Sequence, residues 1–210
     1  MQLITDRHDA KAWVSKSTLL SNSGDYSDAL QHLDRSLQLD PTLAVAWMSR
    51  GVVNAALENY SAALEDLTHA LQIDANSVDA YLNRATVYLQ MKLYQEAIQD
   101  CDRALQLDDH SLAAYFLRSQ IKFVLGLHQE VIQDCDRALQ LDVDSEFVLF
   151  HYIKGSSLLF LGQYRSALDE FLEEFRLTPE PSSDQYYRIA LVQYWLGMNN
   201  KAIAIFVIDW

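Results

Sequence analysis

The sequence predicts an all-α fold in which pairs of helices stack side by side along the chain. The main observation is an internal repeat: residues 98–108 and 132–142 both read IQDCDRALQLD, 34 residues apart. Looser copies of this tail place Asp40, Asp74, Asp108 and Asp142 at the same 34-residue interval. A self-similar period of this length is typical of stacked-repeat proteins. The chain also has only six Gly and three Pro among 210 residues, which favours helices over a turn-rich β fold.

The 34-residue interval divides the chain into an N-terminal extension and a series of repeats within one domain. The extension is 1–9 and the domain is 10–210. Its repeats are 10–43, 44–77, 78–111, 112–145, 148–181 and a partial repeat, 183–210. In the first repeat we expect one helix over about 10–22, a turn, and a second helix over 26–39.

Glycines occupy two distinct places in this frame. Four of them fall at the fifteenth place of their repeats, where a positive φ ends a helix: Gly24, Gly126, Gly162 and Gly197. The other two, Gly51 and Gly155, fall at the eighth place, inside the first helix. A glycine there costs about 1 kcal/mol relative to Ala. We therefore expect the partner helix to pack directly on the backbone at these two places.

Large and small apolar residues alternate between the two helices of each repeat. The fourth place holds Trp13, Trp47, Tyr81 and Tyr115, whereas the twentieth place is Ala in five repeats and Val131 in another. Large side chains facing small ones allow two helices to interlock. Each helix pair keeps an apolar face that only the next repeat can cover, which predicts one continuous core.

These residues resemble the tetratricopeptide repeat family. The second repeat carries the family pattern of aromatic, Gly, Tyr, Ala and large apolar residues as Trp47, Gly51, Tyr60, Ala63 and Leu67. The fifth repeat carries it as Gly155, Gly162, Tyr164, Ala167, Phe171 and Pro179. Departures from the pattern are Ala75, Asp109 and Val143 at the terminal Pro and His128 at the Tyr. The resemblance covers 10–210 and implies a right-handed superhelix that binds other proteins.

Composition argues against several classes of partner. The formal charge is −13, from 16 Lys and Arg against 29 Asp and Glu, so no basic surface for nucleic acid is expected. No run of about 18 apolar residues exists that could span a membrane, and the first ten residues lack a secretion-signal pattern. Cys101 and Cys135 both fall at the buried twenty-fourth place of successive repeats, too far apart for a disulfide. Reduced thiols are typical of a cytoplasmic protein.

The sequence shows no catalytic or metal-binding motif. Its six histidines form no i, i+4 pair and lie at no ligand spacing from a cysteine. Neither a Gly-rich phosphate loop nor a nucleophile motif is present. The paired acids Glu65 and Asp66, and Asp100 and Asp102, are predicted to lie on solvated faces of second helices. We therefore expect a protein that is not an enzyme and that needs no cofactor or metal.

The family resemblance implies a concave groove lined by the first helices, at places two, five, six, nine, twelve and thirteen of each repeat. Along the chain these places change from polar to apolar and aromatic. The residues predicted to contact a partner are Asn83, Phe116, Gln120, Tyr152, Ser156, Tyr187, Leu191 and Tyr194. At two further groove places, Phe123 and Leu159 are equally consistent with filling gaps between repeats. Aromatic rings give large contact area at a small entropic cost.

These observations predict a non-catalytic adaptor that binds a peptide or helix of a partner protein in its groove. Relatives that hold the acidic tail of heat-shock chaperones use Lys, Arg and Asn at five places. Here only Asn83 fits, and the other places hold Met48, Val52, Ala113 and Leu117. Because no cation is available there for a carboxylate, we expect a neutral or basic, partly apolar partner segment.

The last residues leave three alternatives open. Residues 202–210 read AIAIFVIDW, and a polar capping helix, which solenoids usually carry, does not follow. Either the native chain continues or this segment packs back on the fifth repeat, or the segment forms a homodimer. The corresponding alternative functions are a self-association scaffold and an accessory domain of a larger enzyme or regulator.

Overall fold

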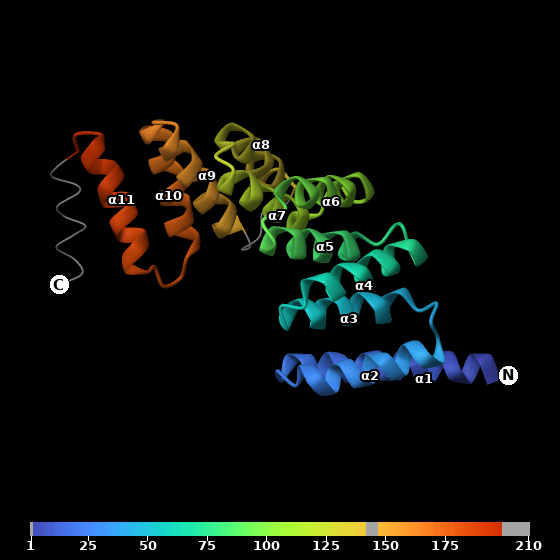
Figure 1. The fold of residues 1–210 in the computed structure, drawn as a ribbon. Coiled ribbons are helices and arrows are strands. Elements are labelled where there is room, and N and C mark those ends of the chain that lie inside the picture. The colour runs from blue at the N-terminus through green and yellow to red at the C-terminus, as the bar shows by residue number, and fades with distance from the viewer. Residues whose placement is uncertain (1, 142–146, 199–210) are drawn as a thin grey trace. The chain divides into compact units, whose positions relative to one another are not determined.

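The computed structural model describes residues 2–141 and 147–198, and these form eleven α-helices without a strand. The chain divides into two compact units, residues 1–111 and residues 112–210. Figure 1 shows the helices of each unit in chain order. The predicted all-α fold of paired helices is confirmed.

The first unit contains three helix pairs. Its helices are α1 (Gln2–Asn22), α2 (Tyr26–Leu39), α3 (Ala44–Ala56), α4 (Tyr60–Ile73), α5 (Val78–Gln90) and α6 (Tyr94–Leu107). Each odd-numbered helix packs on the even-numbered helix that follows it, and α2 packs on α3 as α4 does on α5. The first helices also touch one another in order, α1 with α3 and α3 with α5. The pairs therefore stack in sequence order.

The second unit repeats this arrangement. Its helices are α7 (Leu112–Val124), α8 (His128–Leu139), α9 (Val148–Phe160), α10 (Tyr164–Leu177) and α11 (Ser183–Trp195). Here α7 pairs with α8 and α9 with α10, while α8 packs on α9, α10 on α11 and α7 on α9. Phe171 and Ile189 lie in one buried cluster of this unit, so α10 and α11 share a core.

Helix α1 begins earlier than the repeat frame suggested. It starts at Gln2, whereas the first helix was expected from about Ala10. Residues 2–9 contain no Gly or Pro, so nothing in the local sequence stops the helix from extending toward the N-terminus. The segment predicted as an extension therefore continues the first helix of the stack. The division into one domain, 10–210, stays a prediction.

The turn inside each repeat has the backbone conformation that the sequence indicated. Gly24, Gly126, Gly162 and Gly197 all have positive φ, between 73° and 85°. At the same place in the second and third repeats, Glu58 and Lys92 take φ of 60° and 61°. The left-handed conformation thus belongs to the turn, and it forms even where the residue carries a Cβ.

The two glycines inside first helices are sites of close helix contact, as predicted. A Cβ built on Gly155 would lie 2.7 Å from Cε1 of Phe171, and one on Gly51 would lie 2.8 Å from Cγ of Leu67. Phe171 and Leu67 are the large residues at the twenty-fourth place of the second helices. The missing side chain is therefore what lets the two helices of a repeat approach.

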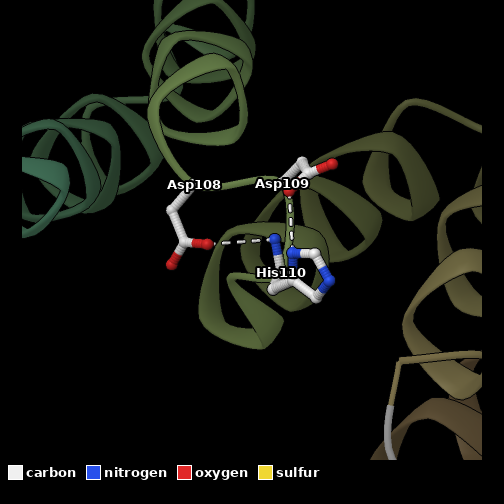
Figure 2. A group of neighbouring side chains, drawn as sticks. All are labelled: Asp108, Asp109 and His110. Carbon is white, nitrogen blue, oxygen red and sulfur yellow. Dashed lines mark hydrogen bonds and ion pairs between the residues drawn. The ribbon is translucent and has the colours of Figure 1, made fainter.

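The recurring aspartate has a structural role at the end of each second helix. The Oδ1 atom of Asp40 accepts the backbone N–H of Thr42, that of Asp74 accepts from Asn76, and that of Asp108 accepts from His110, each at 3.0 Å. Figure 2 shows the third of these bonds. Such Asx turns hold the chain as it leaves a helix, so the aspartate helps to fix the connection between repeats. Asp142 lies outside the described residues.

Within the part of the chain that the structure describes, no helix is both long and apolar enough to cross a membrane.

Candidate partner-binding groove

An apolar hollow of about 280 Å³ lies on the second unit, between the neighbouring first helices α7 and α9. Four of the predicted groove residues line it, Phe116 and Gln120 from α7 and Tyr152 and Ser156 from α9. These residues are four positions apart on each helix, so they share one face. The remaining lining residues are Phe123, Val124, Leu149 and Ile153.

Three of those remaining residues were not singled out from the sequence, although a signal for them was present. Leu149, Ile153 and Val124 occupy the second, sixth and thirteenth places, which the family resemblance assigns to the groove. Leu149 and Val124 are 52% and 60% exposed. Aliphatic side chains this open to water form an unfilled apolar surface.

Phe123 both lines the groove and fills space between helices, the two roles that the sequence left open. It lines the hollow, and its ring also lies edge-on to His128 at 5.4 Å and to Phe160 at 5.7 Å. Leu159, in contrast, packs against the buried cluster around Phe171. Of the two ambiguous residues, Phe123 therefore faces the groove and Leu159 belongs to the packing between helices.

The hollow offers little hydrogen-bonding capacity. The Oγ of Ser156 donates to the backbone oxygen of Tyr152 at 2.8 Å, within the same helix. In the described residues, the side-chain amide of Gln120 has no hydrogen-bond partner, although it is partly exposed. None of the eight lining residues is charged. The surface is therefore largely apolar, and the amide of Gln120 and the hydroxyl of Tyr152 are its polar groups without a hydrogen-bond partner in the described residues.

The other predicted groove residues lie outside the hollow. Tyr187 and Tyr194 on α11 are 53% and 62% exposed, and Leu191 is partly buried. Asn83 lies on α5, in the first unit, and is also partly buried. The structure thus places four of the eight predicted residues around one hollow, and a role for any of them in binding stays a prediction.

Arg188 is a residue near the groove that the sequence did not reveal. Its guanidinium lies 4.7 Å from the ring centroid of Tyr152, and its Nη2 is 2.7 Å from Oε1 of Glu174. A cation placed over a tyrosine ring is attracted electrostatically to the face of that ring. Arg188 therefore connects α11 to a ring of the hollow on α9 and to a buried carboxylate on α10.

Two glutamates on α10, one turn apart, have opposite pKa shifts. Burial raises the pKa of Glu174 above 4.5, and the charge of Arg188 and the hydrogen bond from Gln185 only partly oppose this. Burial also acts to raise the pKa of Glu170, but hydrogen bonds and charge from His151 and Lys154 outweigh it, so the pKa falls below 4.5. His151 Nδ1 and Lys154 Nζ both lie 2.6 Å from its carboxylate oxygens.

The prediction that the paired acids lie on solvated faces is wrong for one member of each pair. Asp66 and Asp100 are only 4% and 6% exposed. Arg50 binds Asp66 and Arg84 binds Asp100, each through two hydrogen bonds. Their neighbours behave as expected, since Glu65 is exposed and Asp102 partly so. Charge alone did not identify which acid faces the first helix.

The one cluster of possible metal ligands in the described residues lies in the turn after α6. Asp108, Asp109 and His110 are all exposed. As Figure 2 shows, His110 Nδ1 contacts Oδ1 of Asp109 at 2.7 Å, and its backbone N–H donates to Asp108. The Asx turn therefore accounts for the grouping, and the expectation that the protein needs no metal stays a prediction.

Both cysteines are fully buried, as their place in the repeat predicts. Burial, followed by the nearby charge of Asp134, raises the pKa of the Cys135 thiol to about 12. At neutral pH this side chain is therefore a protonated, small apolar residue of the core.

Comparison with known families identifies tetratricopeptide repeats directly in the sequence. Two tetratricopeptide repeat family models match residues 17–82 and residues 78–111. No curated protein sequence is a significant match to the chain.

Among solved structures, the chain is similar to PilF of Pseudomonas aeruginosa, with a TM-score of 0.81 and 16% identity over 96% of this chain and 90% of that one. It is also similar to YrrB, described as having an unusual peptide-binding site, with a TM-score of 0.65 and 22% identity over 82% and 88%. A third is the first such domain of Spaghetti bound to the HSP90 peptide SRMEEVD, with a TM-score of 0.54 and 21% identity over 57% and 94%. At these identities the likeness is one of fold.

Proposed function

The chain is a tetratricopeptide repeat protein, and from this premise we propose that it is a non-catalytic adaptor that holds a segment of a partner protein along α7, α9 and α11. The tetratricopeptide fold indicates a protein–protein interaction module. The proposal adds the place of binding and the character of the partner. It also includes a cytoplasmic location, which the protonated, buried thiol of Cys135 supports.

The observation that carries this proposal is the hollow between α7 and α9. Its rings come from Phe116, Phe123 and Tyr152, and Tyr187 and Tyr194 lie exposed on α11. Aromatic residues of this kind dominate the energy of protein interfaces. Rings that gather on neighbouring helices of one unit in this way favour a surface that a partner covers.

The charges support a neutral or basic, partly apolar segment as the partner. The net charge of −13 disfavours an acidic partner. YrrB is described as peptide-binding, and the Spaghetti domain is bound to the acidic peptide SRMEEVD. At the five places that would hold such a tail, this chain has Met48, Val52, Asn83, Ala113 and Leu117, which offer no cation for a carboxylate.

The test is a comparison of groove and non-groove variants. Peptides are selected from a random library on the wild-type protein, and Kd is measured for Tyr152→Ala with Tyr187→Ala. We expect a wild-type Kd in the micromolar range, about −8 kcal/mol, and at least about a tenfold loss in the variant. Helicity should be unchanged, because Tyr152 and Tyr187 are 40% and 53% exposed and neither belongs to the buried core.

The matched control is Leu172→Ala with Leu19→Ala. Both leucines are exposed, at 43% and 71%, and neither lines the hollow. This control should bind as the wild type does. Undiminished binding by the tyrosine double variant, with every selected peptide, would rule out the groove as the site.

A second candidate function is self-association through residues 202–210, whose sequence AIAIFVIDW is strongly apolar. That segment lies outside the described residues. Sedimentation at micromolar concentration tests this function. A monomer of 24.0 kDa excludes self-association. A dimer that is lost when residues 203–210 are deleted supports it.

A further inference from the structure

The hollow between α7 and α9 is a small apolar site. Its volume is about 280 Å³. Sites that enclose whole small-molecule ligands measure roughly 300–1,000 Å³. This hollow lies at the lower end of that range, and it is open to solvent, since Val124 and Leu149 in its lining are exposed. It therefore suits a single group that projects from a longer chain.

Two charged groups near the hollow already have partners. Lys122, next to Phe123 in the chain, places its Nζ 2.9 Å from Asp134 and 3.3 Å from Glu130. Arg188, over the ring of Tyr152, pairs with Glu174 at 2.7 Å. A charged side chain entering the hollow would lose its hydration and find no counter-ion, which is costly. The occupant is therefore uncharged.

Two polar groups of the hollow, the hydroxyl of Tyr152 and the side-chain amide of Gln120, have no hydrogen-bond partner in the described residues. The amide has the greater capacity, since it can donate two hydrogen bonds and accept two. Ser156 is already committed to the backbone oxygen of Tyr152. A peptide group presents one donor and one acceptor, which an amide side chain satisfies together. The occupant's neighbouring main chain can therefore bind here.

We propose that this hollow is an anchor pocket that takes one uncharged aromatic or large aliphatic side chain of the partner segment, while Gln120 hydrogen-bonds the main chain beside it. This inference rests on the proposed function and adds to it the feature that the partner must carry. Buried anchors of this type, in a desolvated pocket, supply most of the affinity of an interface.

The first test uses single residues with blocked termini as probes. N-acetyl-tryptophanamide, N-acetyl-leucinamide and N-acetyl-lysinamide are titrated into ¹⁵N-labelled full-length protein, and amide shifts are followed by NMR. The tryptophan and leucine probes should shift residues of α7 and α9 around Gln120 and Ser156, with Kd on the order of 1 mM. The lysine probe should leave these residues unshifted.

The matched variant fills the hollow from the protein side. Ser156→Leu places an aliphatic side chain in it, and Ser166→Leu makes the same change at an exposed position of α10. Leu is a better helix former than Ser, so both variants should fold. Ser156→Leu should weaken the tryptophan probe at least about tenfold, and Ser166→Leu should leave its affinity unchanged.

The role of Gln120 is tested with a probe that lacks peptide groups. Gln120→Leu should weaken N-acetyl-tryptophanamide several-fold, by about one hydrogen bond, and should not weaken 3-methylindole, which has the ring alone. Equal losses for the two probes would remove Gln120 from the proposal. The pocket itself would be overturned if the tryptophan probe shifted residues elsewhere in the protein. It would also be overturned if the probe caused no shifts at about 10 mM, a concentration about ten times the expected Kd.

The library peptides separate this inference from the proposed function. If Tyr152→Ala with Tyr187→Ala weakens them but Ser156→Leu does not, the groove binds a partner without an anchor, and only this inference fails. If neither variant weakens them, the proposed function fails as well. Shifts of hollow residues that grow with protein concentration alone would assign the hollow to a second copy of the chain and would also overturn the anchor.

Discussion

The guanidinium of Arg84 binds the buried carboxylate of Asp100 through two hydrogen bonds, Nε to Oδ2 at 2.7 Å and Nη2 to Oδ1 at 2.8 Å. The same pairing joins Arg50 to Asp66 one repeat earlier and Arg118 to Asp134 one repeat later.

Each of these pairs fastens the first helix of a repeat to its own second helix, and some also reach the preceding repeat. Arg50 contacts Asp34 at 2.7 Å, and Arg84 donates to Oγ1 of Thr68 at 3.2 Å. In the fifth repeat Lys154 takes the arginine's place, with Glu170 at 2.6 Å and Asp136 at 2.7 Å. Ion pairs of Arg50, Arg84, Arg118 and Lys154 with carboxylates of second helices therefore recur from repeat to repeat, and we call this series the charge ladder.

Removing one partner of the ladder should be strongly destabilising. We expect Asp100→Ala to lower the free energy of unfolding by about 3 kcal/mol, at the low end of the range of about 3–5 kcal/mol for buried pairs. The low end applies because the Arg84 side chain is still 17% exposed and keeps some contact with water. Urea denaturation followed by circular dichroism measures the change.

The control for that prediction is an exposed pair. Arg176 and Glu173 are 70% and 48% exposed, so Arg176→Ala should cost less than about 1 kcal/mol. A second variant, Arg84→Met with Asp100→Leu, removes both charges and should recover much of the loss. If Asp100→Ala costs no more than Arg176→Ala, the ladder is not a source of stability.

Gly155→Ala should destabilise the second unit although Ala is the better helix former. The added Cβ would lie 2.7 Å from a ring carbon of Phe171, which is only 1% exposed and cannot move aside. Overpacking costs about 1–3 kcal/mol and the helix gains about 1 kcal/mol, so we expect a net loss of up to about 2 kcal/mol. Ser166→Ala, at an exposed position of α10, is the control and should be neutral or stabilising. A stabilising Gly155→Ala would contradict the close approach.

Glu170 should stabilise the protein at neutral pH and cease to do so in acid. Its folded-state pKa lies below the ordinary value of 4.5, so its contribution is present above pH 4.5 and is lost as the pH falls through the folded-state pKa. The stability difference between wild type and Glu170→Gln should therefore shrink between pH 7 and the acid range. Urea denaturation at stepped pH measures it, and a constant difference would refute this account.

Glu174, one turn further along the same helix, should show the reverse dependence. Its pKa is raised, so its contribution is fully present below pH 4.5 and declines as the pH rises through the folded-state pKa. Relative to wild type, Glu174→Gln should therefore gain stability as the pH rises. The two variants serve as controls for each other, since a general effect of acid would move both in the same direction.

Cys135 should be unreactive while the protein is folded. The thiol is fully buried and its pKa is about 12, so almost no thiolate forms at pH 8. Iodoacetamide should modify it only after urea unfolding, as mass spectrometry of the digested protein would show. Modification of the native protein at the rate of the unfolded chain would mean that the helix pair around it opens readily.

The fold was predictable because its signals are local and repeat. Gly24 and Gly126 recur at the turn, and Asp40, Asp74 and Asp108 recur at the helix ends, so each turn is specified by residues within a few positions of it. The start of α1 was misplaced because the repeat period sets no boundary before the first repeat.

The candidate site was only half predictable. The family resemblance predicted which places of each repeat face the groove. It could not predict which of these residues surround a common hollow, because that depends on the distances between helices. Phe116 and Tyr152 meet at one hollow while Tyr187 does not, and Arg188 reaches Tyr152 from a different helix. Asp66 and Asp100 were predicted to face water because the polar sides of second helices do so, and only packing shows which of two neighbouring acids turns inward.

By itself the sequence determined the period, the helix pairs and the class of protein, because the residues that indicate them recur in successive 34-residue repeats. Tertiary structure decided which carboxylates are buried beside an arginine and which groove residues enclose space. The reason is physical: burial and pKa depend on the separation between helices that are distant in sequence, and no local pattern of residues fixes that separation.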